Sequence, residues 1–331
     1  MIITRTPFRI PIGGGGTDLP SYYNKYEGAL ITAAINKYMY ININQPAVTD
    51  TIKINYSRTE EVNVDEINSI KHEIVRETLK YLKIERPLEI SSMADLSGGT
   101  GMGSSSSYTV GLLSGLNQML RRHIPISELA EQACKIEIEL IGKPIGKQDQ
   151  YAAAVGGIIE MHIDRLGKVT YAQLNLNQEV VYELENRLMM FYTGIQRDAN
   201  NILQEQSDKA KIDESKVVNA MHAIKSIGVE IKNNLLMGDV DKVGALMNDH
   251  WNIKKSISTS MSSSDIDTWY DLGMKNGAIG GKIMGAGGGG FMLFCVRNGN
   301  RRILRTVMEA AGLKYMDFRF DFEGTKIMAN L

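Results

Sequence analysis

The chain has 331 residues, 43% of them hydrophobic and 23% charged, and its formal net charge is −1. This length predicts a globular protein of about two domains, and the balanced charge excludes the basic surface that a nucleic-acid-binding protein needs. No apolar run reaches the roughly 18 residues that would span a membrane. The two cysteines cannot build a disulfide framework. We therefore expect a cytoplasmic protein with no nucleic-acid or membrane partner.

The first predicted element is a strand over residues 2–12, which ends in four glycines and the pair Thr17-Asp18. The glycines let the backbone pass close to a bound molecule, and Asp18 is a short carboxylate suited to sugar hydroxyls. A plain tight turn is the alternative. Arg9 lies inside the strand, where a buried cation without a partner would be costly. We therefore expect Arg9 on an open face or beside an anionic group.

Strands over residues 28–43 and 51–56 follow, rich in Ile, Thr and Tyr, and predict a meander with the first strand. Residues 65–82 have the apolar spacing of one amphipathic helix. Residues 88–93 predict a further strand, which leads into the most informative segment of the chain.

That segment, residues 96–109, reads LSGGTGMGSSSSYT and continues into an apolar helix. Its glycines let backbone N–H groups turn inward, and its serines begin a helix whose first amides lack internal partners. The helix dipole favours an anion there, so a phosphate could lie on residues 101–105. Ser104 and Ser105 would offer hydroxyls to this phosphate or its metal. A Walker lysine is missing, and a flexible linker is the alternative.

Residues 127–141 predict a second amphipathic helix that places one carboxylate, Glu137, in the middle of its apolar face. The other residues of that face are Ala130, Ala133, Cys134, Leu140 and Ile141. A buried carboxylate forms an ion pair, accepts hydrogen bonds or binds a metal. A structural ion pair and a metal site both remain open for Glu137.

Asp149 follows in a segment where Pro144 and Gly146 prevent the helix from continuing, just before the small-residue run 151–157. An aspartate in a loop usually forms a turn. This one, however, follows the inward-facing Glu137 in the same half of the chain as the glycine-serine segment. One carboxylate for a metal and one for proton abstraction are the minimum for phosphoryl transfer to a hydroxyl.

The second half of the chain is richer in helices, and we place a domain boundary near residue 185, which gives domains 1–185 and 186–331. The elements expected beyond residue 157 are strands at 158–174 and 188–193, a polar loop at 194–201, helices at 214–236 and 240–255, a serine-rich loop at 256–264, a strand pair joined by the glycine run 285–290, a helix at 301–311 and two final strands. Helix pairs with antiparallel strands predict an α/β sandwich.

Three landmarks in this order resemble the GHMP kinases, the small-molecule kinases that include galactokinase, homoserine kinase and mevalonate kinase. They are the RTPFR strand at 5–9, the GMGSSSS loop at 101–107 and the GAGGGG loop at 285–290. The first motif, residues 6–23, looks most like the branch that acts on heptose phosphates, with fucose kinases as cousins. It lacks the Gly-Glu-His of galactokinases.

The resemblance implies an α+β fold with an N-terminal domain similar to ribosomal protein S5 domain 2, a ferredoxin-like C-terminal domain and a site in the cleft between them. It implies ATP-dependent phosphorylation of the anomeric C1 hydroxyl of D-glycero-D-manno-heptose 7-phosphate. The product would be the 1,7-bisphosphate, on the way to nucleotide-activated heptose and surface polysaccharide.

Roles follow from the same resemblance. Asp149 would be the base and Arg9 would stabilise the transferring phosphoryl group, while Ser105 and Glu137 would hold Mg²⁺. The ATP phosphates would lie on Gly99, Gly101, Gly103, Ser104, Ser105, Ser106 and Ser107. The sugar would contact Gly15, Gly16, Thr17, Asp18, Gly287 and Gly288.

Two departures from the family pattern stand out. Ser106 replaces the usual alanine of the loop, and the segment 144–149 is one residue longer than in mevalonate kinases, so the role of Asp149 rests on the sugar-kinase branch. Lys147, Arg197 and Lys282 are candidate partners of the far phosphate of the sugar. Whether the chain forms a homo-oligomer stays open.

Three alternatives remain. A fucose kinase would use the same fold on a free sugar. A non-catalytic sugar sensor would be expected to lose Asp149 or Glu137, which are both present. A dinucleotide oxidoreductase would need a helix directly after the first glycine run, where Pro20 is expected to prevent one.

Overall fold

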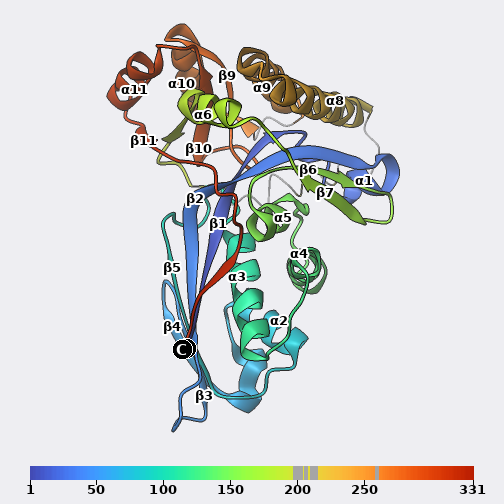
Figure 1. The fold of residues 1–331 in the computed structure, drawn as a ribbon, viewed down its shortest axis with the longest axis vertical. Coiled ribbons are helices and arrows are strands. Elements are labelled where there is room, and N and C mark those ends of the chain that lie inside the picture. The colour runs from blue at the N-terminus through green and yellow to red at the C-terminus, as the bar shows by residue number, and fades with distance from the viewer. Residues whose placement is uncertain (197–203, 205–207, 209–214, 258–260) are drawn as a thin grey trace.

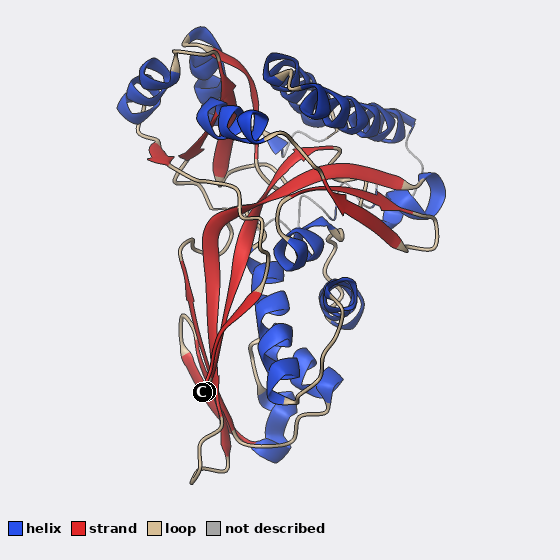
Figure 2. Ribbon diagram, in the orientation of Figure 1, coloured by secondary structure: helices blue, strands red, loops and turns tan. Residues whose placement is uncertain are grey.

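The computed structural model of the chain describes residues 1–196, 204, 208, 215–257 and 261–331. Within these residues, the strands form an eight-stranded sheet and a four-stranded sheet, each covered by helices (Figures 1 and 2). The predicted polar loop at 194–201 and serine-rich loop at 256–264 lie partly outside the described residues.

The large sheet is built on two long strands, β1 (Ile2–Gly13) and β2 (Gly28–Asn44), which pair antiparallel along most of β1. In sheet order its main path is β12 (Lys326–Asn330), β1, β2, β5 (Leu88–Ala94), β3 (Thr51–Asn55) and β4 (Thr59–Asn63). The other end of β2 pairs with β6 (Ile158–Ile163), and β6 pairs with β7 (Val169–Gln173).

The predicted meander is wrong, because β5 lies between β2 and β3 and runs parallel to β3. A helix also begins directly at Pro20, namely α1 (Pro20–Tyr26), so the expectation that this proline prevents a helix is wrong. Proline suits the first helical turn because its missing N–H would have no partner there. The antiparallel pairing of β1 and β2 nevertheless differs from the parallel βαβ unit of a dinucleotide fold.

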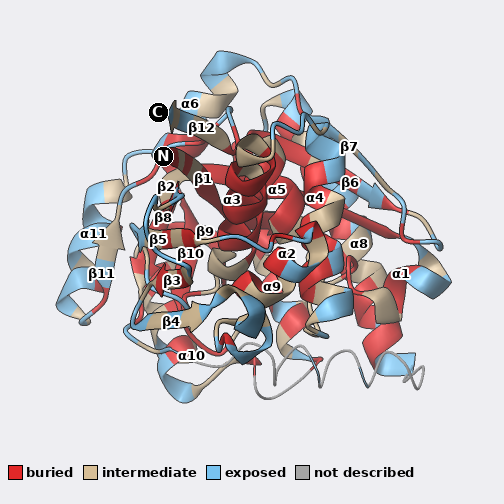
Figure 3. Ribbon diagram, turned by 90° about the horizontal axis from the view of Figure 1, so that it is seen from below, coloured by how far each residue is buried: buried red, intermediate tan, exposed pale blue. Residues whose placement is uncertain are grey.

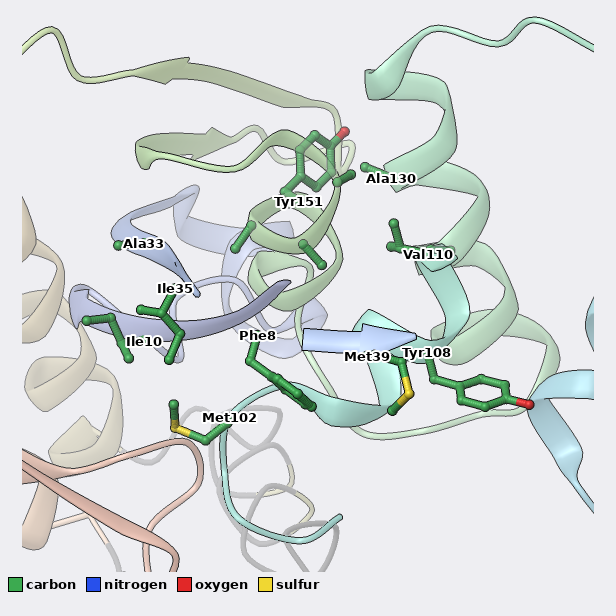
Figure 4. Close-up of a cluster of buried hydrophobic side chains, with 14 of the residues drawn as sticks. Phe8, Ile10, Ala33, Ile35, Met39, Met102, Tyr108, Val110, Ala130 and Tyr151 are labelled. Carbon is green, nitrogen blue, oxygen red and sulfur yellow. The ribbon is translucent and has the colours of Figure 1, made fainter. Parts of the chain in front are cut away.

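One face of the large sheet is covered by α2 (Glu73–Leu82), α3 (Ser104–Met119), α4 (Ile126–Cys134) and α5 (Gln148–Val155) (Figure 1). The central helix, α3, is largely buried (Figure 3). Two glycines permit its close approach to the sheet: a Cβ on Gly111 would lie 2.7 Å from Thr6 Oγ1, and one on Gly115 2.7 Å from Ile43 Cδ1. Figure 4 shows the hydrophobic core between these layers.

Two predicted helices differ from the structure. Residues 65–82 form a 3-10 turn (Val64–Ser69) and then α2, because the His72 side chain accepts a hydrogen bond from Val75 N and caps a new helix. Beyond α4 the chain continues as a π-helical turn (Lys135–Leu140). This turn changes the helical period, so Leu140 is 44% exposed instead of lying on the apolar face.

The small sheet has the order β11 (Lys314–Met316), β8 (Leu188–Tyr192), β10 (Phe291–Val296) and β9 (Ala278–Ile283). Its companion helices are α6 (Gln178–Arg187), α9 (Val240–Lys255), α10 (Ser264–Lys275) and α11 (Arg301–Ala310). Helix α8 (Ser215–Met237) packs on α9 and against β1 and β2 of the large sheet. The sequence did not indicate α6 or α10. Helix α9 lies directly on β9, since a Cβ on Gly280 would be 2.1 Å from Gly244 O.

The two ends of the chain meet, because β12 pairs with β1 and the Met1 amino group donates to Leu331 O at 2.7 Å. The last strand therefore belongs to the large sheet and not to the small one. In the part of the chain that the structure describes, the helices are all too short or too polar to cross a membrane.

Candidate active site

The glycine-serine loop forms an open helix N-terminus. Gly101 and Gly103 have φ of +76° and +79°, a left-handed conformation that favours glycine, and Gly103 is the N-cap of α3. No side chain caps this helix within the described residues, so its first amides are available to an anion. A Cβ on Gly101 would lie 2.8 Å from Met284 O, which shows how tightly the loop packs on the C-terminal glycine run.

The four serines of the loop divide into two pairs. Ser104 and Ser105 are half-buried, and their hydroxyls lie at the start of α3. Ser106 and Ser107 are buried, and Ser107 Oγ donates to Pro7 O at 2.8 Å. Of the hydroxyls expected to meet a phosphate, the first two are therefore the accessible ones.

Glu137 is fully buried beside Ser105, as the sequence predicted for its side of the helix. Ser105 Oγ donates to Glu137 Oε1, and Gln150 Nε2 donates to Glu137 Oε2 at 2.8 Å. The Lys143 ammonium lies 2.5 Å from Ser105 Oγ and 3.1 Å from Glu137 Oε1. These two oxygens thus already hold a cation, which is what a metal site at this place requires.

The described residues contain no cluster of three or more His, Cys, Asp or Glu side chains that could bind a metal. A magnesium ion does not need one, because it is usually held by one or two carboxylates together with substrate phosphates and water. The oxygen set of Ser105 and Glu137 fits such an ion. Glu137 also forms an ion pair with Lys143, which is the structural role that the sequence left open for it.

Arg9 and Asp149 are joined by a bidentate ion pair, although 140 residues separate them. Arg9 Nε and Nη2 each lie 2.6 Å from an oxygen of Asp149, and Nη1 donates to Gly101 O at 2.6 Å. Arg9 is only 4% exposed, so the expectation of an anionic partner is confirmed. Asp149 lies in the first turn of α5, not in a loop. Both side chains therefore adjoin the glycine-serine loop.

Asp18 is buried near Asp149 and bonds to the neighbouring residue Gln148. Its carboxylate accepts hydrogen bonds from Gly16 N at 3.0 Å and Gln148 N at 3.1 Å. Burial raises the pKa of Asp18, and the nearby charge of Asp149 raises it further, against the lowering effect of these backbone bonds. A Cβ on Gly146 would lie 1.9 Å from Asp18 Oδ2, so this glycine makes room for the carboxylate.

A cavity of about 60 Å³ brings these groups together. From the N-terminal half its lining includes Arg9, Gly15, Gly16, Asp18, Gly146 and Asp149, and from the C-terminal half His250, Lys254, Lys282, Gly285 and Ala286. The sequence reasoning did not find His250 or Lys254. Their spacing of four on one helix, among apolar residues, was the signal that could have found them.

Other predicted residues lie elsewhere. Thr17 is buried, and its hydroxyl donates to Gly14 O and Ala29 O, so it holds the loop rather than facing the cavity. Gly287 and Gly288 pack against the backbone of Met261 and are absent from the cavity's described lining. Gly99 has φ of +74° in the glycine-serine loop.

The three candidates for a second phosphate are also separated. Lys147 pairs with Glu131 at 2.8 Å and donates to Gly167 O at 2.6 Å, and it is not part of the described lining of the cavity. Lys282 lines the cavity. Arg197 lies outside the described residues.

Comparison with known proteins places the chain in a family. Residues 68–157 match the model of the GHMP kinases N terminal domain, and residues 221–310 match that of the GHMP kinases C terminal domain. The D-glycero-alpha-D-manno-heptose 7-phosphate kinase of Campylobacter jejuni is 32% identical, and the match covers 98% of each chain. A bifunctional fucokinase/GDP-fucose pyrophosphorylase of Arabidopsis thaliana is 23% identical over 89% of this chain and 30% of its own length.

Solved structures agree in fold. A D-glycero-D-manno-heptose 1-phosphate kinase from Bacteriodes thetaiotaomicron superposes with a TM-score of 0.82 at 24% identity, over 100% of both chains. A putative sugar kinase from Campylobacter jejuni gives 0.77 at 28% identity, over 98% of this chain and 97% of that one. The family models and the full-length relative, together with the shared fold, show that this chain belongs to the GHMP kinases.

Proposed function

We propose that this kinase transfers the γ-phosphoryl group of ATP to the anomeric C1 hydroxyl of D-glycero-D-manno-heptose 7-phosphate and releases the 1,7-bisphosphate. The observation that carries the proposal is the single cavity in which Asp149, Arg9 and Asp18 lie next to the open N-terminus of α3. The relative that matches over 98% of each chain is named a heptose 7-phosphate kinase, which supports this choice of acceptor. The product would then serve the synthesis of nucleotide-activated heptose for surface polysaccharide.

The ATP phosphates would lie on the glycine-serine loop, where no side chain of the described residues caps the first amides of α3 and where Ser104 and Ser105 are only half-buried. Ser105 and Glu137 would hold Mg²⁺. When bound, this ion supplies positive charge that offsets the charge developing on the phosphates. Lys143 would give up its position between the two oxygens to the metal and remain near the phosphates.

Asp149 would accept the proton of the C1 hydroxyl. Arg9 occupies one lone pair on each carboxylate oxygen, so further lone pairs remain for a substrate hydroxyl. An anomeric hydroxyl is more acidic than an ordinary alcohol, which makes a single carboxylate sufficient as base. Arg9 would at the same time offset negative charge on the group in transfer.

Asp18, with the backbone of Gly15 and Gly16, would hold the sugar hydroxyls. The domain division that fits this arrangement is 1–185 for the nucleotide-binding part and 186–331 for the part that closes the acceptor site. Strand β12 returns to the first sheet and ties the two together.

The substrate is tested by comparing kcat/KM for heptose 7-phosphate, free heptose and L-fucose. A phosphate dianion gains charge-assisted hydrogen bonds of about 1.5–3 kcal/mol each, and 1.4 kcal/mol corresponds to tenfold. We expect the phosphorylated sugar to be used at least about tenfold better, with the new phosphate at carbon 1 by ³¹P NMR. Equal values for free and phosphorylated sugars would favour the fucose kinase alternative instead.

Gly146→Ala tests the place of Asp18. The new Cβ would lie 1.9 Å from Asp18 Oδ2, so the carboxylate must move. Because a displacement of about 1 Å at a reacting site can reduce the rate about 100-fold, we expect kcat/KM for the acceptor to fall by that order while KM for ATP changes little. If Gly146→Ala keeps the wild-type kcat/KM for the acceptor, Asp18 does not hold the sugar.

A further inference from the structure

Within the described residues, two lysines of the cavity are buried without an ion-paired carboxylate. Lys254 is 9% exposed and donates to Gly285 O at 2.6 Å, and Lys282 is 2% exposed and donates to Ile12 O at 2.8 Å. Both acceptors are neutral backbone carbonyls. Among the described residues, no carboxylate lies within ion-pair distance of either ammonium. Buried lysines are rare unless they are paired.

A third polar side chain lines the same cavity. His250 is 1% exposed, and neither of its ring nitrogens has a hydrogen-bond partner in the described part of the chain. It lies four residues before Lys254 on α9 and therefore on the same side of the helix. Lys282 lies on β9, and α9 packs on this strand where Gly280 meets Gly244. One helix and one strand thus bring three nitrogen donors to the cavity.

The carboxylates of the cavity are engaged elsewhere. Asp149 accepts hydrogen bonds from Nε and Nη2 of Arg9, and Asp18 accepts two backbone hydrogen bonds. Burial lowers the pKa of Lys254 to about 8, with the charge of Arg9 as a further cause. Burial, and then the charge of Lys254, also hold the pKa of Lys282 well below its usual value. An anion bound in the cavity would offset this burial and stabilise the protonated form of both lysines.

We propose that Lys254, Lys282 and His250 form the binding site for the phosphate that the acceptor already carries, at the end of the sugar away from the reacting hydroxyl. The inference rests on the proposed function and names the residues that would make the enzyme prefer a phosphorylated sugar. A phosphate dianion matches two ammonium groups, and an N–H of the imidazole supplies a third donor. The γ-phosphate of ATP is the other source of the same chemistry.

The test measures kcat/KM for heptose 7-phosphate and for free heptose in Lys254→Met and Lys282→Met. Each loses one charge-assisted bond, so we expect the preference for the phosphorylated sugar to fall about ten- to a hundredfold. Turnover of free heptose and KM for ATP should stay near the wild-type values. Lys255→Met is the matched control, because this neighbour on α9 faces Asp267 instead. An equal loss of kcat/KM with both sugars would indicate that the two lysines bind the γ-phosphate of ATP and would overturn the proposal.

Binding of inorganic phosphate separates this site from the proposed reaction. Phosphate should raise the Tm of the wild type and of Lys255→Met more than that of the two cavity variants, which retain only the anion site at the N-terminus of α3. Without phosphate, the cavity variants should melt at or above the wild-type Tm, because each removes an unpaired buried cation. A fall in Tm would instead make the lysines structural. If the wild type responds to phosphate yet does not phosphorylate heptose 7-phosphate, the proposed function fails and the site stands.

The pH dependence of kcat/KM is a second test of the proposal. Since only protonated Lys254 binds an anion, kcat/KM for heptose 7-phosphate should fall as pH rises through about 8. Lys254→Arg keeps its charge and should move this fall to higher pH. The other charged or titratable groups that line the cavity are Arg9, Asp18, Asp149, His250 and Lys282. Free heptose should lack the fall, and its presence there would assign it to another group.

Discussion

Asp149→Asn is expected to reduce kcat by about 10²–10⁴ while both substrates still bind, because removal of a positioned general base typically has an effect of this size. The amide keeps the shape of the carboxylate but accepts no proton at neutral pH. Arg9 donates to both oxygens of Asp149, so the variant also leaves a buried guanidinium without its anion. We therefore expect a lower Tm as well.

The two effects can be separated. Single-turnover rates with saturating ATP and sugar report the transfer step, and binding of each substrate reports whether the site is intact. Asp271→Asn, an exposed position on α10, controls for the loss of a carboxylate elsewhere. Near-normal kcat in Asp149→Asn would show that Asp149 only positions Arg9 and that the reaction needs no base from this chain.

Glu137→Gln is the second variant with a large expected effect. A bound Mg²⁺ would stabilise the charge of the transition state by several kcal/mol, and 1.4 kcal/mol corresponds to a tenfold change in rate, so we expect kcat to fall about 100-fold or more. The Mg²⁺ concentration needed for half-maximal rate should rise, and a chelator should abolish turnover of the wild type. The glutamine retains an oxygen for Ser105, so the fold should persist.

Glu139→Gln is the matched control, because Glu139 is exposed two residues farther along the same helical turn. An active Glu137→Gln enzyme with unchanged Mg²⁺ dependence would leave Glu137 with a structural role only, as the partner of Lys143 and Gln150. The inward position of Glu137 would then be explained by that ion pair alone.

The positions of the two carboxylates, Glu137 and Asp149, could be predicted from the local sequence pattern to different extents. The inward direction of Glu137 follows from its neighbours within one turn on either side, so helical spacing predicted it. The same spacing failed at Leu140, where a π-helical turn changes the period. Asp149 was found by its position after the helix, yet its place in the first turn of α5 was not.

The sequence by itself determined the long strands, the open glycine-serine helix start and the inward glutamate. Each of these depends on residues close together in the chain, such as the glycines that adopt positive φ before α3. It also determined the family, through three motifs whose order needs no contact between them.

Only the tertiary structure decided which distant residues meet. The insertion of β5 between β2 and β3, the pairing of Arg9 with Asp149 and the convergence of Lys254 with Lys282 all depend on contacts between distant segments. Hydrophobic periodicity says which face of a strand or helix is buried, but it does not say which partner covers that face. For this reason the sequence named Lys282 as a candidate phosphate ligand but missed His250 and Lys254, which α9 brings to the same cavity.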